Sequence, residues 1–311
     1  MSNTIRVLTP ALQELALENC NENPDTVECH ISALQSWIKQ SPHLKARMDK
    51  KLLLAFLRRC QFSMEETKKR IDAFYTMKIH CREFLCEREV TKSLIHLYNT
   101  GVYIIPIRPS SAIGPRIIII PLVKQDPKFM NLNEIFKIFF MLLEVLAMED
   151  DNATVAGIVF IFDIRDITME QMRKCDRALL KKNWLFGERC MPLKLIEIHL
   201  IHMRRDTFTI YNIMSNFLSC KKHFKVFMHK KAEDIFKYLP REALPIEYGG
   251  QNGYQAEALE YWRHKLLQYT DYFANDDNFG TIEKNRICLT KRFEHRDFCG
   301  LNGSYRKLQV D

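Results

Sequence analysis

The chain has 311 residues, is 47% hydrophobic and carries a formal net charge of +8. This length suffices for a sizeable core in one large domain or two smaller ones. No stretch approaches the roughly 20 continuous apolar residues of a bilayer-spanning helix, and "MSNTIRVLTPALQEL" does not read as a secretory signal. We therefore expect a cytosolic protein and exclude membrane-spanning and secreted classes.

The 10 cysteines are scattered and form no Cys-x-x-Cys pair. In a chain without a secretory signal this pattern favours reduced, mostly buried thiols over disulfides. His199 and His202 in "HLIH" stand close together, but no third and fourth ligands lie near them in the sequence. We expect a structural role for them and predict neither a metal nor a cofactor.

The positive charge is concentrated in "KKHFKVFMHKK", residues 221–231, which contain lysines and no acidic residue. A basic segment of this kind suits a polyanion, either nucleic acid or the anionic surface of a membrane. A solvated face without a partner explains it equally well. Net charge alone does not decide between these alternatives.

The first third of the chain predicts a small helical bundle. Thr9-Pro10, Asn23-Pro24 and Ser41-Pro42 each place a capping side chain before a proline suited to the first helical position. Ser63 and Glu66 form a capping box that starts another helix. The bundle should end near residues 86–94, where charge rises and the apolar pattern weakens.

From Gly101 onward the pattern changes to short buried strands. "GVYIIPI" and "RIIIIPL" predict a hairpin, and an amphipathic helix follows over residues 131–146. The strand "VAGIVFIF", the basic helix "MEQMRKCDRALLKKNW" and the strand "LKLIEIHLI" come next. Apolar strands that alternate with helices predict an α/β domain with a largely parallel sheet covered on both faces.

The segment "RDTFTIYNIMSNFLSC" predicts a helix that is apolar on more than one side. Such a helix is either fully buried or covers something apolar that is not protein. The last sixty or so residues begin as a helix and end in a long, weakly patterned tail.

Catalytic motifs are absent from the sequence. It has no Walker-type loop, no Gly-x-Gly-x-x-Gly after a strand and no Gly-x-Ser-x-Gly. Asp163 and Asp166 could act as paired acids, but they also suit a strand end followed by a helix start. We favour the structural interpretation, although histidines and cysteines distant in sequence could still pair in space.

Three stretches of the chain are specific when taken together: "LLLAFLRRCQFSMEETKKRI", "GIVFIFDIRDITMEQM" and "LPREALPIEYGGQNG". They resemble the CRAL-TRIO lipid-binding family, in particular the group of cellular retinaldehyde-binding and α-tocopherol transfer proteins. The C-terminal "GLNGSYRKLQVD" is similar to that of arthropod members. The similarity extends over nearly the whole chain in the family's order.

The resemblance implies an N-terminal helical region over residues 1–90 and a CRAL-TRIO domain over residues 91–255, followed by a C-terminal helix and extended tail over 256–311. The domain would have a mixed, largely parallel sheet and a helical lid, residues 207–219, over an apolar cavity. Positions matching the family's cavity are Phe136, Phe140, Ile158, Phe162, Phe186, Ile198, Met214, Phe217 and Leu218.

The resemblance also implies a phosphoinositide site, because Lys194, Lys221 and Lys225 match basic positions of the α-tocopherol transfer branch. A fourth basic position is Cys60 here, so Arg58 or Arg59 would have to substitute. Arg204 and Arg205 also depart from the family's usual residues before the lid.

The function implied is that of a non-enzymatic, monomeric carrier of a retinoid, tocopherol, carotenoid or similar lipid. It would visit anionic membranes transiently, release its ligand with phosphoinositide assistance and bind no nucleic acid. One alternative is a phosphoinositide-responsive sensor or adaptor that recruits a protein partner, with the C-terminal tail as the recruiting segment. Another is an enzyme acting on the bound lipid through Asp163 or His199.

Overall fold

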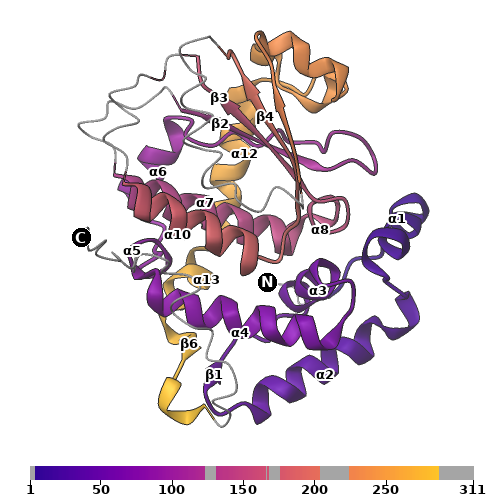
Figure 1. The fold of residues 1–311 in the computed structure, drawn as a ribbon, viewed down its shortest axis with the longest axis vertical. Coiled ribbons are helices and arrows are strands. Elements are labelled where there is room, and N and C mark those ends of the chain that lie inside the picture. Colours follow the sequence, from indigo (N-terminus) through magenta and orange to yellow (C-terminus); the bar gives the residue numbers. More distant parts are fainter. Residues whose placement is uncertain (1–3, 123–130, 166, 168–175, 204–223, 287–311) are drawn as a thin grey trace, which may run out of the picture.

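The computed structural model describes residues 4–122, 131–165, 167, 176–203 and 224–286. Figure 1 shows helices of the N-terminal third packed below two long helices, with a parallel sheet above them.

The N-terminal helices begin largely where their capping residues predict. The Thr9 hydroxyl accepts a hydrogen bond from the Leu12 amide and starts α1, and the Ser63 hydroxyl accepts one from the Glu66 amide and starts α4. Asn23 caps only a 3-10 turn, after which α2 begins. The helices are α1 (Pro10–Cys20), α2 (Val27–Gln40), α3 (Lys50–Arg59), α4 (Met64–His80), α5 (Arg82–Leu85) and α6 (Lys92–Asn99).

The helix start predicted at Ser41-Pro42 is wrong. Ser41 ends α2, and its hydroxyl donates back to the Trp37 carbonyl at 2.8 Å instead of capping a new helix. The chain then runs through the short strand β1 (Leu44–Lys45) before α3 starts after Asp49.

The predicted parallel sheet is confirmed. It has four strands in the order β2-β3-β4-β5, and every neighbouring pair is parallel. Helices α7 (Leu132–Glu149) and α8 (Asp151–Val155) connect β2 to β3, and α10 (Arg177–Arg189) lies between β3 and β4. The strands are β2 (Arg116–Pro121), β3 (Ile158–Asp163), β4 (Leu195–Ile201) and β5 (Lys225–Met228).

The predicted hairpin before β2 is wrong. Only one antiparallel bridge forms, between Ile104 and Ile119, which exchange backbone hydrogen bonds of 3.0 and 2.8 Å. The next hydrogen-bonded position of an antiparallel ladder would be Pro106, which has no N–H to donate. The first of the two segments therefore packs as an extended, buried connection and is not a strand.

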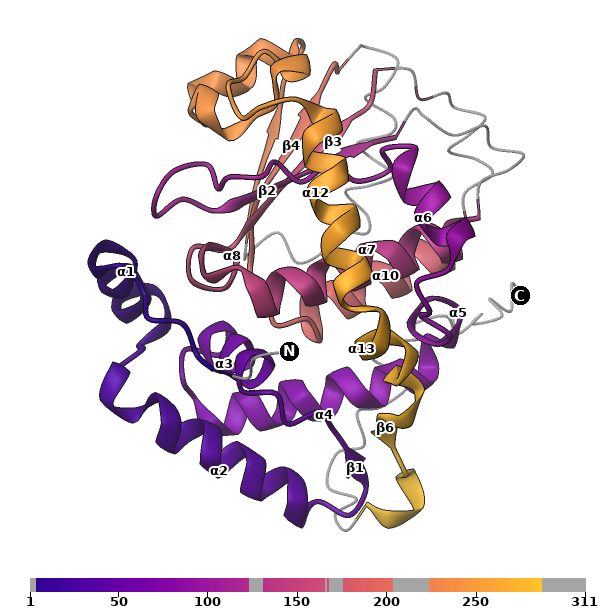
Figure 2. The ribbon, with the colours of Figure 1, turned by 180° about the vertical axis from the view of Figure 1, so that it is seen from behind.

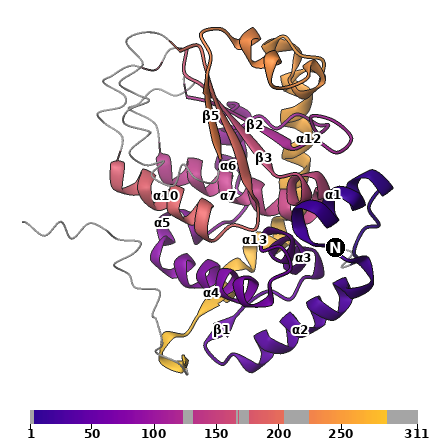
Figure 3. The same ribbon diagram turned by 45° about the vertical axis from the view of Figure 1, so that its right-hand side comes forward.

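Helices α7 and α10 cover one face of the sheet, as the edge-on view in Figure 3 shows. The opposite face packs against α12 (Gln255–Gln268) and short 3-10 helices η2 (Ala232–Lys237), η3 (Arg241–Ala243) and η4 (Ile246–Tyr248). Alternate residues of each strand supply the two faces, because successive strand side chains point to opposite sides.

The C-terminal elements return to the N-terminal helices, as Figure 2 shows. After α12 come α13 (Thr270–Ala274), the 3-10 turns η5 (Asp276–Asn278) and η6 (Glu283–Asn285), and the strand β6 (Gly280–Thr281), which pairs with β1. Arg286 then reaches α4, where its guanidinium lies 2.7 Å from the Asp72 carboxylate. The described part of the weakly patterned tail is thus packed against the helical region.

Candidate functional site

The helix-facing side of the sheet is a continuous apolar surface. Pairing between the strands aligns its side chains in two rows that cross the sheet. The first row is Ile118, Phe160, Ile198 and Val226, and the second is Ile120, Phe162, Leu200 and Met228.

Three of the predicted cavity residues, Ile158, Phe162 and Ile198, lie on this surface. Ile158 and Ile198 are buried, whereas Phe162 is only partly buried. Phe160, which the sequence interpretation omitted, lies between Ile158 and Phe162 on the same face and packs against Phe139 of α7 at a ring distance of 5.6 Å. Strand alternation alone predicts its position.

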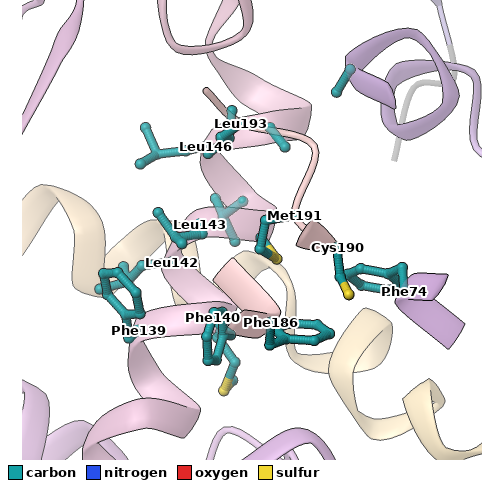
Figure 4. Close-up of a cluster of buried hydrophobic side chains, with 14 of the residues drawn as sticks. Phe74, Phe139, Phe140, Leu142, Leu143, Leu146, Phe186, Cys190, Met191 and Leu193 are labelled. Carbon is teal, nitrogen blue, oxygen red and sulfur yellow. The ribbon is translucent and has the colours of Figure 1, made fainter. Parts of the chain in front are cut away.

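The predicted cavity residues on the helices have a different environment. The rings of Phe140 and Phe186 meet edge to face at 4.8 Å, and Figure 4 shows Phe74 beside Phe186. Phe84 stacks on Phe140 at 5.4 Å and meets Phe136 at 6.0 Å. Phe136, Phe140 and Phe186 therefore pack where α7 and α10 meet the N-terminal helices. Met214, Phe217, Leu218 and the lid predicted at residues 207–219 lie outside the described residues.

At the carboxyl ends of the strands, the apolar surface is incompletely covered. The partly buried residues there, which we call the carboxyl-end apolar set, follow or end β2, β3 and β4 or begin α7 and α10: Leu122, Leu132, Phe162, Leu179, Leu180 and Met203. Open α/β sheets bind ligands outside the carboxyl ends of their strands. This set is the best candidate for a ligand-contacting surface among the described residues.

Asp163 ends β3 beside this set and is 2% exposed. Its carboxylate accepts hydrogen bonds from the Arg165 guanidinium at 2.6 Å, His202 Nδ1 at 2.8 Å and the Tyr248 hydroxyl at 3.4 Å. Burial raises its pKa, but the bonds from Arg165 and His202 outweigh that effect and hold the pKa below its ordinary value. Asp163 thus joins three chain segments, whereas Asp166 lies outside the described residues.

The Tyr-Gly-Gly turn positions Tyr248 for this contact. Gly249 has φ +78°, in the left-handed region that favours glycine, and a Cβ on Gly250 would lie 2.0 Å from the Leu244 carbonyl oxygen. His202 is itself left-handed, with φ 62°, at the point where the chain leaves β4. The backbone conformations of Gly249 and His202 and the close approach at Gly250 thus account for the turns that bring Tyr248 and His202 to Asp163.

His199 lies on the opposite face of the sheet from the apolar surface. Its Nδ1 is 2.9 Å from Nε2 of His229, and its Nε2 is 3.2 Å from the Glu197 carboxylate. Burial lowers the pKa of His229 to about 4, so this imidazole is neutral at neutral pH. Among the described residues, no group of three or more His, Cys, Asp or Glu is arranged to hold a metal ion.

The predicted phosphate-binding lysines that the structure describes lie at the amino end of the sheet. Lys194 is exposed just before β4. Lys225 is exposed at the start of β5, where it lies opposite Glu197 in the strand register. The amino end is opposite the carboxyl-end apolar set. Residues 204–223, which include Lys221 and lie outside the described residues, connect the two ends in sequence.

Arg58 and Arg59, the two arginines considered as substitutes at the missing basic position, differ in their hydrogen bonding. Arg58 is 3% exposed, and its guanidinium donates to Glu22 at 2.6 Å, Asp151 at 2.8 Å and Thr154 at 2.9 Å. Arg59 has a buried Nε with no hydrogen-bond partner among the described residues. Burial and the neighbouring Arg70 charge lower its pKa to about 10, so its positive charge is poorly compensated.

Comparison with known protein families decides the assignment. A family model described as the CRAL/TRIO domain matches residues 103–250, and a model described as a Pinta-like UBA domain matches residues 23–95. The chain contains a CRAL-TRIO domain. The family resemblance inferred from the sequence is therefore confirmed.

Similar proteins align with the chain beyond the matched domain. Alpha-tocopherol transfer protein-like proteins of Homo sapiens and Pongo abelii are each 23% identical over 282 residues, which covers 86% of this chain and 78% of theirs. The Mus musculus protein of the same description is 23% identical over 271 residues. Family and relatives together support lipid binding and transfer as the general role.

A solved structure shows the same CRAL-TRIO fold. The crystal structure of Sfh5 superposes with a TM-score of 0.51 at 12% sequence identity, covering 85% of this chain and 99% of the other. At this identity the similarity concerns the fold alone. No helix in the described part of the chain is long and apolar enough to cross a bilayer.

Proposed function

We propose that this CRAL-TRIO protein holds a hydrophobic small molecule against the helix-facing side of its sheet and transfers it between membranes. The observation that carries the proposal is the carboxyl-end apolar set, whose side chains pack on the core yet remain partly uncovered by described residues. The ligand class is a retinoid, tocopherol, carotenoid or similar lipid, and the protein provides binding without catalysis.

The physical benefit is a change of environment for the ligand. A lipid that leaves a bilayer for water loses about 0.8 kcal/mol of favourable burial per exposed methylene. An apolar surface offered at the membrane removes most of that barrier. Phe162 and its partly buried neighbours at the strand ends are the side chains we expect the ligand to contact.

The basic residues at the amino end of the sheet support an anionic membrane as the site of loading and release. We assign Lys194 and Lys225 to lipid headgroup phosphates, including phosphoinositides, together with Lys221. Arg59 is the better substitute at the fourth basic position, because Arg58 is already saturated by Glu22 and Asp151. If phosphoinositide binds the ligand-releasing state preferentially, it shifts the population toward release.

The histidine and aspartate that could serve catalysis are engaged in the structure. Asp163 is bonded to Arg165, His202 and Tyr248, and His199 is bonded to Glu197 and His229. These contacts favour a carrier over an enzyme. We propose a monomer that works in the cytosol and associates with membranes peripherally and transiently.

A liposome transfer assay tests the proposal. The purified chain is incubated with donor vesicles carrying retinal, α-tocopherol, carotenoid, sterol or phospholipid and with acceptor vesicles that contain or lack phosphatidylserine. We expect transfer of at least one of these lipids, faster toward anionic acceptors and slower at high salt. Absence of both bound and transferred lipid across this panel would refute the carrier function.

Two variant pairs separate the two parts of the proposal. Phe162→Glu should lower lipid binding at least tenfold, whereas Leu267→Glu, on the exposed surface of α12, should leave it unchanged. Lys194→Glu combined with Lys225→Glu should remove the preference for anionic acceptors and preserve lipid binding. Lys45→Glu, a single charge reversal at an exposed position of the N-terminal region, is its control.

A further inference from the structure

Helix α10 turns one largely apolar, partly buried stripe toward the core of the molecule. Leu179, Asn183, Phe186 and Gly187 follow the spacing of residues that share a helix face. Phe186 is fully buried, and a Cβ on Gly187 would lie 3.9 Å from the Phe140 ring of α7. Asn183 is the only polar side chain in this stripe.

The side-chain amide nitrogen of Asn183 is unpaired in the part of the chain that the structure describes. This Nδ2 atom is buried and has no hydrogen-bond partner among the described residues. Native proteins leave few buried polar groups unpaired, because the cost of removing them from water is then not recovered.

Trp184, the next residue, also carries a buried donor without a partner among the described residues. The Nε1 of Trp184 is also buried without an acceptor in the described part of the chain. The indole packs edge to face on Phe224, just before β5, at a ring distance of 5.5 Å. An indole N–H can only donate, so this group requires an acceptor.

The structure of α10 itself does not explain why polar groups occur at Asn183 and Trp184. The start of α10 is capped by Asp176, whose carboxylate accepts from the Ala178 and Leu179 amides. Asn183 lies in the middle of the helix, where asparagine is a poorer helix former than leucine. A leucine there would continue the apolar stripe and leave no unpaired group.

Asn183 also lies next to the candidate ligand surface. Leu179 and Leu180, one turn before Asn183 and Trp184, belong to the carboxyl-end apolar set. The unpaired donors therefore follow directly along the helix from side chains that we expect a ligand to contact.

We propose that Asn183 and Trp184 form the polar end of the ligand site, so that the chain selects a lipid bearing a hydroxyl, carbonyl or carboxylate oxygen over a pure hydrocarbon. The inference rests on the proposed lipid-binding function and defines the ligand class further. The oxygen accepts from the Trp184 indole or the Asn183 amide, and the apolar body of the ligand lies along the strand ends. Buried water bonded to these donors is the competing explanation.

Matched probes test the inference. Binding is measured for three pairs that each combine an oxygenated lipid with its parent hydrocarbon: hexadecanol and hexadecane, cholesterol and cholestane, retinol and deoxyretinol. We expect the wild type to bind the oxygenated member of at least one pair about tenfold more tightly, which corresponds to about 1.4 kcal/mol. Asn183→Leu should abolish that preference and change hydrocarbon affinity less than twofold.

Trp184→Phe is the second variant, because it keeps an aromatic ring against Phe224 and removes only the N–H donor. Lys181→Leu makes the same kind of polar-to-leucine change on the other side of α10 and should preserve the preference. Circular dichroism and melting temperature establish that each variant is folded. Asn183→Leu should melt at or above the wild-type temperature, since it removes an unpaired buried amide.

Two outcomes overturn the inference. A wild type that binds lipids without preferring oxygenated members would exclude a polar anchor. Lower melting temperatures for both variants with an unchanged lipid preference would assign the donors to a buried water. Either result leaves the carrier function standing, whereas failure of the wild type to bind any probe or transfer any lipid refutes both proposals.

Discussion

At the scale of single residues, Asp163 shows how a carboxylate at the end of a parallel strand can be structural. It is buried, and its donors come from residues 165, 202 and 248, which are far apart in sequence. A carboxylate that binds three donors is held in the charged form and positions the segments that carry them. Its role is to join the ends of β3 and β4 to the Tyr-Gly-Gly turn.

Asp163→Asn should therefore lower the free energy of unfolding by about 2 kcal/mol, because it weakens charge-assisted hydrogen bonds in a buried setting. Urea denaturation measures the change. The difference from wild type should shrink as the pH falls below about 4: Asp163 has a depressed pKa in the folded state, so its stabilising contribution is present above the ordinary carboxyl pKa and lost on acidification.

Asp271→Asn, at an exposed position of α13, is the matched control and should change stability by less than about 0.5 kcal/mol. Loss of a lipid-modifying activity in Asp163→Asn with no loss of stability would contradict the structural role and revive the enzyme hypothesis.

At the scale of elements, the segment from α13 to η6 ties the C-terminal end of the described chain to the helical region. Asp276 is 3% exposed and forms ion pairs with Lys78, Arg88 and Arg47. Arg88 also pairs with the buried Glu144 of α7. One short C-terminal turn thus neutralises cations that come from the N-terminal third.

Asp276→Asn should destabilise the protein by about 3–5 kcal/mol, because it leaves buried cations without their counter-charge. Thermal and urea denaturation measure the loss. The neighbouring Asp277→Asn is the control: among the described residues its exposed carboxylate accepts only from the Glu87 amide, at 3.2 Å, and the change should cost less than about 1 kcal/mol. Equal effects of the two substitutions would contradict this role for the buried ion pairs.

The same segment affects how a partner-recruiting tail should be tested. A deletion after Gly280 would remove Thr281 from the pairing with β1, and Arg286 from its contact with Asp72. Such a deletion would damage the fold as well as any recruiting segment. A stop after Arg286 separates the adaptor hypothesis from a loss of stability.

At the scale of the whole molecule, the N-terminal helices and the CRAL-TRIO domain share one hydrophobic core. A single cluster of contacting buried side chains extends from Ile31 of α2 through Phe140 of α7 to Phe273 of α13. Because both regions bury apolar surface against each other, neither should remain folded when the other unfolds.

Calorimetry should therefore show one unfolding transition, with near-ultraviolet and far-ultraviolet dichroism changing together and the calorimetric enthalpy equal to the van't Hoff value. Two resolved transitions, one of them assigned to the helices before residue 96, would show that the two regions unfold independently.

The sequence predicted most helices and strands, but not every pairing between them. Apolar runs identified β2, β3 and β4, and the Ser63 capping box identified the start of α4. The hairpin failed because a pattern of apolar residues does not reveal that Pro106 interrupts hydrogen bonding at the decisive position.

The candidate site was only partly predictable, because a local pattern assigns a residue to a face but does not identify what packs against it. Alternation along β3 and β4 places Ile158, Phe162 and Ile198 on one face, but it does not say which helix covers them. The family resemblance singled out Phe140 and Phe186 without revealing that Phe74 and Phe84 pack against them. Asn183 was missed because one polar residue in a basic helix is unremarkable until its amide is found buried.

The sequence by itself determined the order of most elements, the parallel sheet and the resemblance to the CRAL-TRIO family, because these follow from local periodicity, capping and motif order. Only the tertiary structure decided that Arg58 is saturated, that Asp163 joins three segments and that Nδ2 of Asn183 lacks a partner among the described residues. Burial and hydrogen-bond pairing depend on groups distant in the chain, as between Arg58 and Asp151, 93 residues apart. Spacing along the sequence carries no record of such contacts.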